Sequence, residues 1–293
     1  MEYDMPLFRP PSEARSLIFQ VTLGCSWNRC LFCRMYKTKK YLVRPFDAVE
    51  REIVEMSRRH PGARRVFLGD GDPLEAPTDH LLGILELLNR RFPSLERISA
   101  YAGPTNLLRR TPEELAALKK RGLDILYLGI ETGNDELLAK IRKGATADRI
   151  VEGCRKAIDA GLRMSTFILL GLGGVAGSRA HAKDSARVAN AIDPHFLAAL
   201  TLMPLPDARS YEEEIMGGGF RLIDPVQSLR ELRWFVEELD LSGCKFGTEH
   251  ASNYLPIHGA VLPRDKGRIL SLIDGALAEA SPANLRPEWS RGL

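Results

Sequence analysis

The sequence predicts an α/β fold, a partial (β/α)6 TIM-like barrel followed by a mainly helical C-terminal extension. Two observations predict the α/β class. Apolar strand-like runs alternate with amphipathic helical segments through most of the chain, and glycine-rich or acidic loops follow the strand-like runs. Strict alternation implies parallel strands joined by crossover helices, in a doubly wound sheet or a (β/α) barrel. The chain has 293 residues, enough for one such domain or two small ones.

The individual elements follow from the spacing of apolar residues. Runs of apolar, β-branched or aromatic residues predict strands at Ser16–Leu23, Arg65–Leu68, Arg97–Tyr101, Ile125–Ile130, Ser165–Leu170 and Phe196–Leu202. Helical spacing predicts helices at Asp47–Arg59, Thr78–Arg91, Pro112–Arg121, Asp135–Ile141, Ala147–Ala160 and Ser178–Ala191.

The pattern changes to helices after Pro206, with a break at the three glycines 217–219. We therefore expect three parts. Residues 1–15 form an N-terminal extension, residues 16–207 the barrel, and residues 208–293 a helical extension that covers the barrel opening.

Polar loops follow the strands where chemistry is expected. In parallel α/β folds, ligands bind at the carboxyl ends of the strands. These ends are predicted to lead into Gly24-Cys25, Gly69–Pro73, Ala102–Asn106, Glu131–Asn134 and Gly171–Gly174. We expect all of these loops on one rim.

Composition narrows the class of protein. No apolar run approaches the roughly 18 residues that span a bilayer, and the first fifteen residues lack the apolar region of a signal peptide. We expect a cytoplasmic protein with no membrane partner. The net charge of +3 does not indicate a nucleic-acid partner and does not exclude one.

Three of the five cysteines stand in one short stretch, "TLGCSWNRCLFCRMYK", with the spacing C-x4-C-x2-C at Cys25, Cys30 and Cys33. Structural zinc takes four ligands, and no histidine lies within residues 1–59. A cubane iron–sulfur cluster held by three cysteines keeps one iron open for a ligand. The stretch therefore favours such a cluster over zinc or packed thiols.

Together with three later motifs, this stretch resembles the radical S-adenosylmethionine (SAM) superfamily over roughly residues 16–207. The likeness is to elongator-like, methylthiotransferase-like and oxygen-independent coproporphyrinogen oxidase-like members. Phe32 stands at their aromatic position before the last cysteine. "FLGDGDPL", "GIETGNDELLAKIRKG" and "FILLGLGG" follow in order, where the strand-two, strand-four and strand-five motifs stand.

The chain departs from the family pattern in two places. Most members have three residues between the first two cysteines, and this chain has four, Ser26 to Arg29. The usual glutamate after the strand-five motif is also missing, since Val175-Ala176-Gly177 follows Gly174. The adenine contacts there are then expected from backbone.

The resemblance implies a 4Fe–4S cluster and SAM as cofactors. It implies that Gly69 and Gly71 approach the methionine end of SAM through backbone, and that Asp70 or Asp72 accepts from its ammonium group. The alternative for each aspartate is a helix cap in an ordinary turn.

Later motifs supply the remaining cofactor groups. Glu131 is expected to accept from the ribose or the ammonium group, and Arg142 or Lys143 to pair with the carboxylate of SAM. The alternatives are solvated side chains at helix ends. Gly171 and Gly173 are expected to support the adenine.

A polar segment near the C-terminus supplies the substrate-side candidates. Glu249, His250, Asn253, Tyr254 and His258 gather within ten residues. Histidine exchanges protons near neutral pH and tyrosine donates a proton or hydrogen atom, so His250 and Tyr254 are the catalytic candidates. The alternative is a polar loop that caps the barrel by hydrogen bonds.

Two other groups of residues carry weaker predictions. The basic run from Lys37 to Arg44 is suited to an anionic substrate, or is a solvated loop. Cys154 and Cys244 are expected to be packed thiols. Two remaining cysteines cannot hold a second cluster, so methylthio transfer is not expected.

The predicted function is reductive cleavage of SAM at the cluster, which yields a 5'-deoxyadenosyl radical for hydrogen abstraction from an unidentified substrate. A reducing partner such as a flavodoxin or ferredoxin is implied. The alternatives are a tRNA- or porphyrin-directed member of the same superfamily, and a non-catalytic iron–sulfur or zinc redox sensor or scaffold.

Overall fold

The computed structural model describes residues 3–203, 220–278 and 285–292. They form two compact units, Met1–Leu128 with Glu152–Met164, and Gly129–Val151 with Ser165–Leu293. The predicted boundary between residues 207 and 208 lies outside the described residues, as does the break at 217–219. The three predicted parts stay a prediction.

The first unit is built on parallel strands. β1 (Leu17–Gln20), β4 (Arg65–Gly69), β5 (Arg97–Tyr101) and β6 (Leu123–Glu131) pair in that order. Strand β6 continues from the first unit into the second, and the whole strand order is β1-β4-β5-β6-β7-β8-β9-β10. The predicted α/β class with mostly parallel strands is confirmed.

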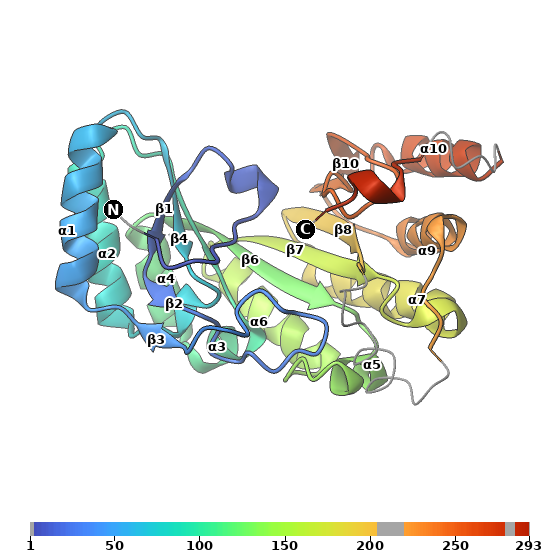
Figure 1. Ribbon diagram of the computed structural model, residues 1–293, viewed down its shortest axis with the longest axis horizontal. Helices are drawn as coiled ribbons and strands as arrows, with labels where there is room; N and C mark the ends of the chain where they lie inside the picture. The colour runs from blue at the N-terminus through green and yellow to red at the C-terminus, as the bar shows by residue number, and fades with distance from the viewer. Residues whose placement is uncertain (1–2, 204–219, 279–284, 293) are drawn as a thin grey trace. The chain divides into compact units, whose positions relative to one another are not determined.

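Helices follow the strands of the first unit in sequence and pack on one another. They are α1 (Phe46–Arg59), α2 (Thr78–Arg91), α3 (Pro104–Arg109), α4 (Pro112–Lys120) and the end of α6 (Ala147–Asp159). Figure 1 shows α1 and α2 side by side. The core of this unit includes Phe19, Phe67 and Phe92, which are completely or almost completely buried. Burial of these aromatic side chains stabilises the unit.

The second unit holds the rest of the sheet. β7 (Arg163–Leu170), β8 (Phe196–Thr201) and β9 (Cys244–Gly247) are parallel, and β10 (Ala260–Leu262) is antiparallel to β9. Its helices are α5 (Asp135–Lys140), the start of α6, α7 (Gly174–Ile192), α9 (Pro225–Glu238) and α10 (Lys266–Ala278). Within this unit α9 packs against both α7 and α10 (Figure 1).

Most of the predicted elements form with small shifts of their ends. The predicted helix Thr78–Arg91 and strand Arg97–Tyr101 match α2 and β5 end for end. The C-terminal extension was expected to be mainly helical, but it also adds β9 and β10 to the sheet. β9 has four residues and β10 has three, and β10 is too short to show the alternation by which strands are predicted.

We expect truncation after Pro206 to yield insoluble protein. The truncation removes α9, which packs against α7, and β9, which pairs with β8, and so exposes the faces they cover. Newly exposed apolar surface of this kind promotes aggregation. The soluble fraction after centrifugation measures the effect. A truncated protein that stays soluble and assembles a cluster would contradict this expectation.

Candidate functional site

The three clustered cysteines lie on one loop at the carboxyl end of β1. Strands β2 (Thr22–Leu23) and β3 (Leu42–Val43) pair antiparallel and close the base of this loop. Cys25, Cys30 and Cys33 are each half-buried on it. Across the described ranges, no three or more His, Cys, Asp or Glu side chains converge as a ready metal site. The backbone thus brings the cysteines onto one short loop without converging their side chains.

Asp70 anchors both ends of the cysteine loop. Its fully buried carboxylate accepts hydrogen bonds from the backbone N–H of Gly24, at 3.2 Å, and from Lys39 Nζ, at 2.9 Å. Lys39 also forms a 2.9 Å ion pair with Asp4. A buried carboxylate needs such partners, because desolvating an unpaired charge is costly. Asp70 therefore already has a cationic partner within the protein.

Two residues of the basic run, Lys39 and Arg44, form ion pairs within the protein. Arg44 makes a two-pronged ion pair with Glu52, at 2.7 and 2.9 Å. Lys37 donates to the carbonyl oxygen of Asn28, at 2.7 Å, and Lys40 is exposed. Lys39 and Arg44 are thus loop-stabilising residues, and an anionic substrate would have to be held by Lys37 and Lys40.

Asp72 lies in a different environment from Asp70. Its side chain is buried, with the residue only 5% exposed, and accepts hydrogen bonds from the Ser26 hydroxyl and the Asn106 amide. Among the described residues no lysine or arginine forms an ion pair with it, although the charge of Arg109 is near enough to act against the rise of its pKa that burial causes. Burial raises the pKa of Asp72 from near 3.8 to about 7, although both hydrogen bonds oppose the rise. Asp72 is a buried carboxylate with neutral donors only.

Gly71 brings the strand-two loop against the cysteine loop. A Cβ atom at this position would lie 2.6 Å from the ring of Tyr36 and 3.1 Å from Cβ of Cys25. Any side chain here would force the two loops apart. Gly69 is buried at the end of β4, and a Cβ there would make only ordinary contacts. Close approach therefore requires glycine at Gly71 and not at Gly69.

Glu131 ends β6 in the second unit with a left-handed backbone, φ 65°. The residue is 4% exposed, and Oε1 accepts from Lys143 Nζ at 2.9 Å. A Cβ at Gly129 would lie 1.9 Å from Oε1, so glycine there is needed to seat the carboxylate. Between the two predicted basic candidates, Lys143 contacts Glu131, whereas Arg142 is exposed.

The strand-five motif forms a tight turn between β7 and α7. Gly171 has φ 90°, a conformation that glycine adopts without strain, and its N–H donates to Glu231 at 2.8 Å. A Cβ at Gly173 would lie 3.0 Å from the backbone of Gly177. Both predicted glycines are therefore required by the turn.

Comparison with protein families identifies this arrangement. The model of the radical SAM superfamily matches residues 19–181, which is more than half of the chain. The chain belongs to the radical SAM superfamily. Members of this superfamily use a 4Fe–4S cluster and SAM, so the predicted cofactors stand, and the non-catalytic zinc or scaffold alternative is not favoured.

Curated relatives share this radical SAM segment but differ in function. The chain is 24% identical to the heme chaperone HemW of Bacillus subtilis (strain 168) over 190 residues, 64% of this chain and 48% of that protein. It is 26% identical to a putative methylthiotransferase of Methanocaldococcus jannaschii over 185 residues, 58% and 39%. The chain thus spans less than half the length of these relatives, and its own substrate does not follow from them.

Solved structures confirm the radical SAM barrel-like fold. Coproporphyrinogen III oxidase (HemN) from Escherichia coli, described as a radical SAM enzyme, superposes with a TM-score of 0.58 at 20% identity, over 76% of this chain and 51% of that one. Methylornithine synthase (PylB) superposes with a TM-score of 0.52 at 20% identity, over 77% and 63%. At these identities the likeness concerns the fold alone.

The radical SAM cofactors fit the polar groups present. In the described part of the chain, the buried atom Glu131 Oε2 has no hydrogen-bond partner, whereas the Tyr36 hydroxyl lies beside the Asp70 carboxylate, and burial together with that carboxylate raises the pKa of Tyr36. Buried polar atoms are normally satisfied, so unsatisfied ones point to a ligand or water. Phe32 is half-buried beside Cys33 on the cysteine loop. The three thiols of the first unit and the spare Glu131 oxygen of the second are donors and acceptors of the kinds that the two cofactors need.

One buried pair of polar side chains in the second unit lies outside the radical SAM motifs and was not predicted from the sequence. His181 on α7 and Glu231 on α9 are both completely buried and lie 2.8 Å apart. One signal was available in the sequence. Glu231 lies one turn before Phe235 on the apolar face of its helix, where a carboxylate is out of place unless it is paired.

The C-terminal polar segment is tied into the fold. Tyr254 donates to Glu288 at 2.9 Å, accepts from Arg291, and lies beneath that guanidinium, 4.0 Å from the ring centroid. Burial raises the pKa of Tyr254 to about 12. His250 Nδ1 accepts from the Ser252 N–H at 3.2 Å, and burial lowers the pKa of the imidazole. These contacts give both residues a structural role, and their catalytic roles stay a prediction.

Of the three remaining residues named in this segment, one is buried and two are exposed. Asn253 is buried and bonds the carbonyl oxygens of Ala199 and Thr248, at 2.8 and 3.0 Å. Glu249 and His258 are exposed and face each other at 3.1 Å. Two buried residues of this segment, Asn253 and Tyr254, therefore connect it to β8 and to the C-terminal residues.

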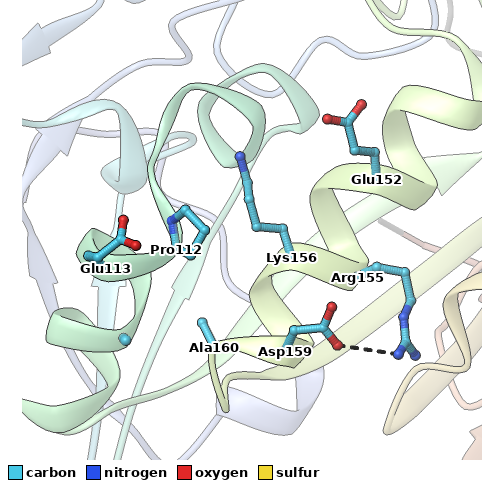
Figure 2. A pocket seen from close by; sticks show the side chains of 8 residues that line it. Pro112, Glu113, Glu152, Arg155, Lys156, Asp159 and Ala160 are labelled. Atoms are coloured by element: carbon cyan, nitrogen blue, oxygen red, sulfur yellow. Dashed lines mark hydrogen bonds and ion pairs between the residues drawn. The ribbon is translucent and has the colours of Figure 1, made fainter.

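A surface pocket in the first unit lies away from these motifs. Figure 2 shows residues of α4, such as Pro112 and Glu113, facing residues of α6. Arg155 and Asp159 on its wall pair with each other at 3.3 Å, and Lys156 donates to the carbonyl oxygen of Leu108. No predicted cofactor residue lines this pocket, and we assign it no function.

We expect the stability of the cofactor-free protein to fall with pH because of Asp72. Its pKa is raised on folding, so between pH 4 and 7 the folded state holds a proton that the unfolded state has lost. The free energy of unfolding then falls by about 1.4 kcal/mol per pH unit in that window. Asp72→Asn should remove this slope. Urea unfolding of both proteins at pH 5, 6 and 7 measures it, and parallel profiles would count against the assignment.

Proposed function

We propose that this chain cleaves SAM reductively and uses the resulting radical on a substrate that remains to be identified. Cys25, Cys30 and Cys33 would hold the cluster. When bound, the cluster supplies one electron to the sulfonium of SAM, which gives methionine and a 5'-deoxyadenosyl radical that takes a hydrogen atom from the substrate. The family match and the single cysteine loop support this proposal.

Asp72 carries the proposal for the methionine end of SAM. Its carboxylate is buried, has only neutral donors, and is joined to the cysteine loop through Ser26. An ammonium group is the partner that such a carboxylate lacks, and a charge-assisted hydrogen bond to it would offset the desolvation of the carboxylate. Asp70 already pairs with Lys39. We therefore assign ammonium binding to Asp72 and loop anchoring to Asp70.

The second unit is proposed to bind the rest of the cofactor. Glu131 keeps Oε2 available while Oε1 pairs with Lys143, so it can accept from the ribose hydroxyls or the ammonium group. Lys143 is better placed than Arg142 for a role beside Glu131. The backbone of the Gly171–Gly173 turn would contact the adenine, as the family motif implies.

The experiment is anaerobic purification, reconstitution and reduction with dithionite. We expect about four irons and four sulfides per chain, as a cubane cluster requires, and formation of 5'-deoxyadenosine from SAM. Stoichiometric zinc in place of iron, or a protein that holds the cluster and does not bind SAM, would overturn the proposal.

The partners are proposed only as classes. A one-electron donor of the flavodoxin or ferredoxin type is required by the chemistry, and a cytoplasmic location fits such a donor. The described residues contain no helix long and apolar enough to cross a membrane. One relative, 28% identical over 179 residues, is named a tRNA-2-methylthio-N(6)-dimethylallyladenosine synthase, and one structural neighbour is named a coproporphyrinogen III oxidase. These names keep a tRNA- or porphyrin-directed role as the second candidate.

A further inference from the structure

A buried polar network links the two predicted cofactor-binding turns of the second unit. His181 Nδ1 and Glu231 Oε1 lie 2.8 Å apart, and both side chains are completely buried. They come from α7 and α9, which pack along each other in Figure 1. Glu231 lies outside the residues that match the radical SAM family.

Glu231 holds the turn after β7. Its Oε1 accepts from the N–H of Gly171 at 2.8 Å, and its Oε2 accepts from the Ser178 hydroxyl. Gln227 donates in turn to Ser178 Oγ, at 3.1 Å. Every carboxylate oxygen thus has a donor, as a buried charge requires. The carboxylate fixes the position where the Gly171 backbone leaves the strand.

His181 reaches the other turn. Its Nε2 lies 3.3 Å from the carbonyl oxygen of Glu131, whose backbone is left-handed. A left-handed conformation costs a non-glycine residue about 1–2 kcal/mol, so Glu131 needs support from its surroundings. A carbonyl oxygen and a carboxylate both accept, so each ring nitrogen faces an acceptor, and the tautomer of the imidazole sets which nitrogen donates.

We propose that the His181–Glu231 pair is a positioning device for SAM binding, which sets the Gly171 turn for the adenine and the Glu131 carboxylate for the ribose or ammonium group. The inference rests on the proposed function. It also accounts for the missing glutamate of the strand-five motif, because α9 supplies a carboxylate to that turn. For stability alone, well-packed apolar side chains would serve as well as a buried pair.

Three variants distinguish a positioning role of the His181–Glu231 pair from a role in folding alone. Glu231→Ala removes the acceptor for the Gly171 N–H, whereas Glu231→Gln keeps an oxygen there. His181→Asn keeps an amide near the Nδ1 position and loses the ring nitrogen that faces the carbonyl oxygen of Glu131. Glu237→Ala removes an exposed carboxylate of the same helix and is the control.

Two measurements apply to the reconstituted protein, the Kd for SAM by calorimetry and amide hydrogen exchange of the 171–174 turn without SAM. We expect Glu231→Ala to weaken SAM binding about tenfold, the loss of about 1.4 kcal/mol, and to speed exchange at Gly171. Glu231→Gln and the control should stay within about threefold of wild type. His181→Asn should weaken binding by about three- to tenfold and leave exchange at Gly171 slow.

The outcomes distinguish the inference from the proposed function. A wild-type protein that does not bind SAM ends the proposed function, and this inference with it. If wild type binds SAM, unchanged binding in Glu231→Ala or His181→Asn, or equal losses in Glu231→Ala and Glu231→Gln, overturns the inference alone. Should Glu231→Ala fail to fold, the His181→Asn result decides.

Discussion

Serine in place of Cys25, Cys30 or Cys33 is expected to abolish stable cluster assembly in each single variant. A hydroxyl is a poor substitute for a thiolate on iron, and a cubane with one iron reserved for SAM has no ligand to spare. The loss should exceed the roughly 10- to 100-fold in metal affinity that follows removal of an outer-shell partner. Iron and sulfide content and visible absorbance after anaerobic reconstitution measure it.

Cys154 and Cys244 supply the matched control for this experiment. Both are buried in the fold, and burial raises the pKa of the Cys244 thiol to about 12, which opposes the thiolate that iron requires. Serine at either position should leave the cluster content unchanged. If Cys244→Ser lost the cluster and Cys30→Ser kept it, the ligand assignment would be wrong.

Glu131→Gln is expected to weaken SAM binding by about 10- to 100-fold while the cluster stays intact. The amide keeps the shape of the side chain but removes its charge, and a hydrogen bond between charged partners contributes roughly 1.5–3 kcal/mol. That energy corresponds to the stated loss of affinity. Calorimetric titration of the reconstituted variant with SAM measures it, and absorbance before and after dithionite tests the cluster.

A nearby carboxylate gives the control for charge alone. Glu136 lies on α5, is largely exposed, and pairs with Lys140 at 2.7 Å. Glu136→Gln removes the same charge from the same segment, and it should bind SAM like wild type because exposed pairs contribute little. Equal affinity in Glu131→Gln and wild type would show that Glu131 is only a helix-start carboxylate, and would transfer its role to Asp72.

Local features of the chain were enough to predict most of the fold. Apolar spacing located α2 and β5 to the residue, because each buries one continuous face against its own neighbours in the sequence. The same criterion missed β10, which is three residues long and has no period to detect. It also missed α3, a helix of six residues that follows directly on β5.

The sequence by itself indicated the family, which the family match confirms, and it predicts the three cysteine ligands, because C-x4-C-x2-C and three ordered glycine motifs are local patterns set by what the cofactors need. Only the tertiary structure shows the partners and the burial of the residues within those motifs. Asp70 and Asp72 are two residues apart, and the sequence does not distinguish their roles. In the structure Asp70 forms an ion pair with Lys39, whereas Asp72 is buried and accepts from neutral donors. Charge pairing and burial depend on which segments meet in space, and spacing along the chain does not encode that.

The same distinction applies at Glu131 and at Gly171. Arg142 and Lys143 are adjacent in sequence, and the turn after α5 presents Lys143 to Glu131 and leaves Arg142 exposed. The partner of Gly171 is Glu231, sixty residues later on α9. The sequence marks each motif residue, whereas desolvation and hydrogen-bond geometry, which exist only once the helices have packed, decide which of them can face a ligand.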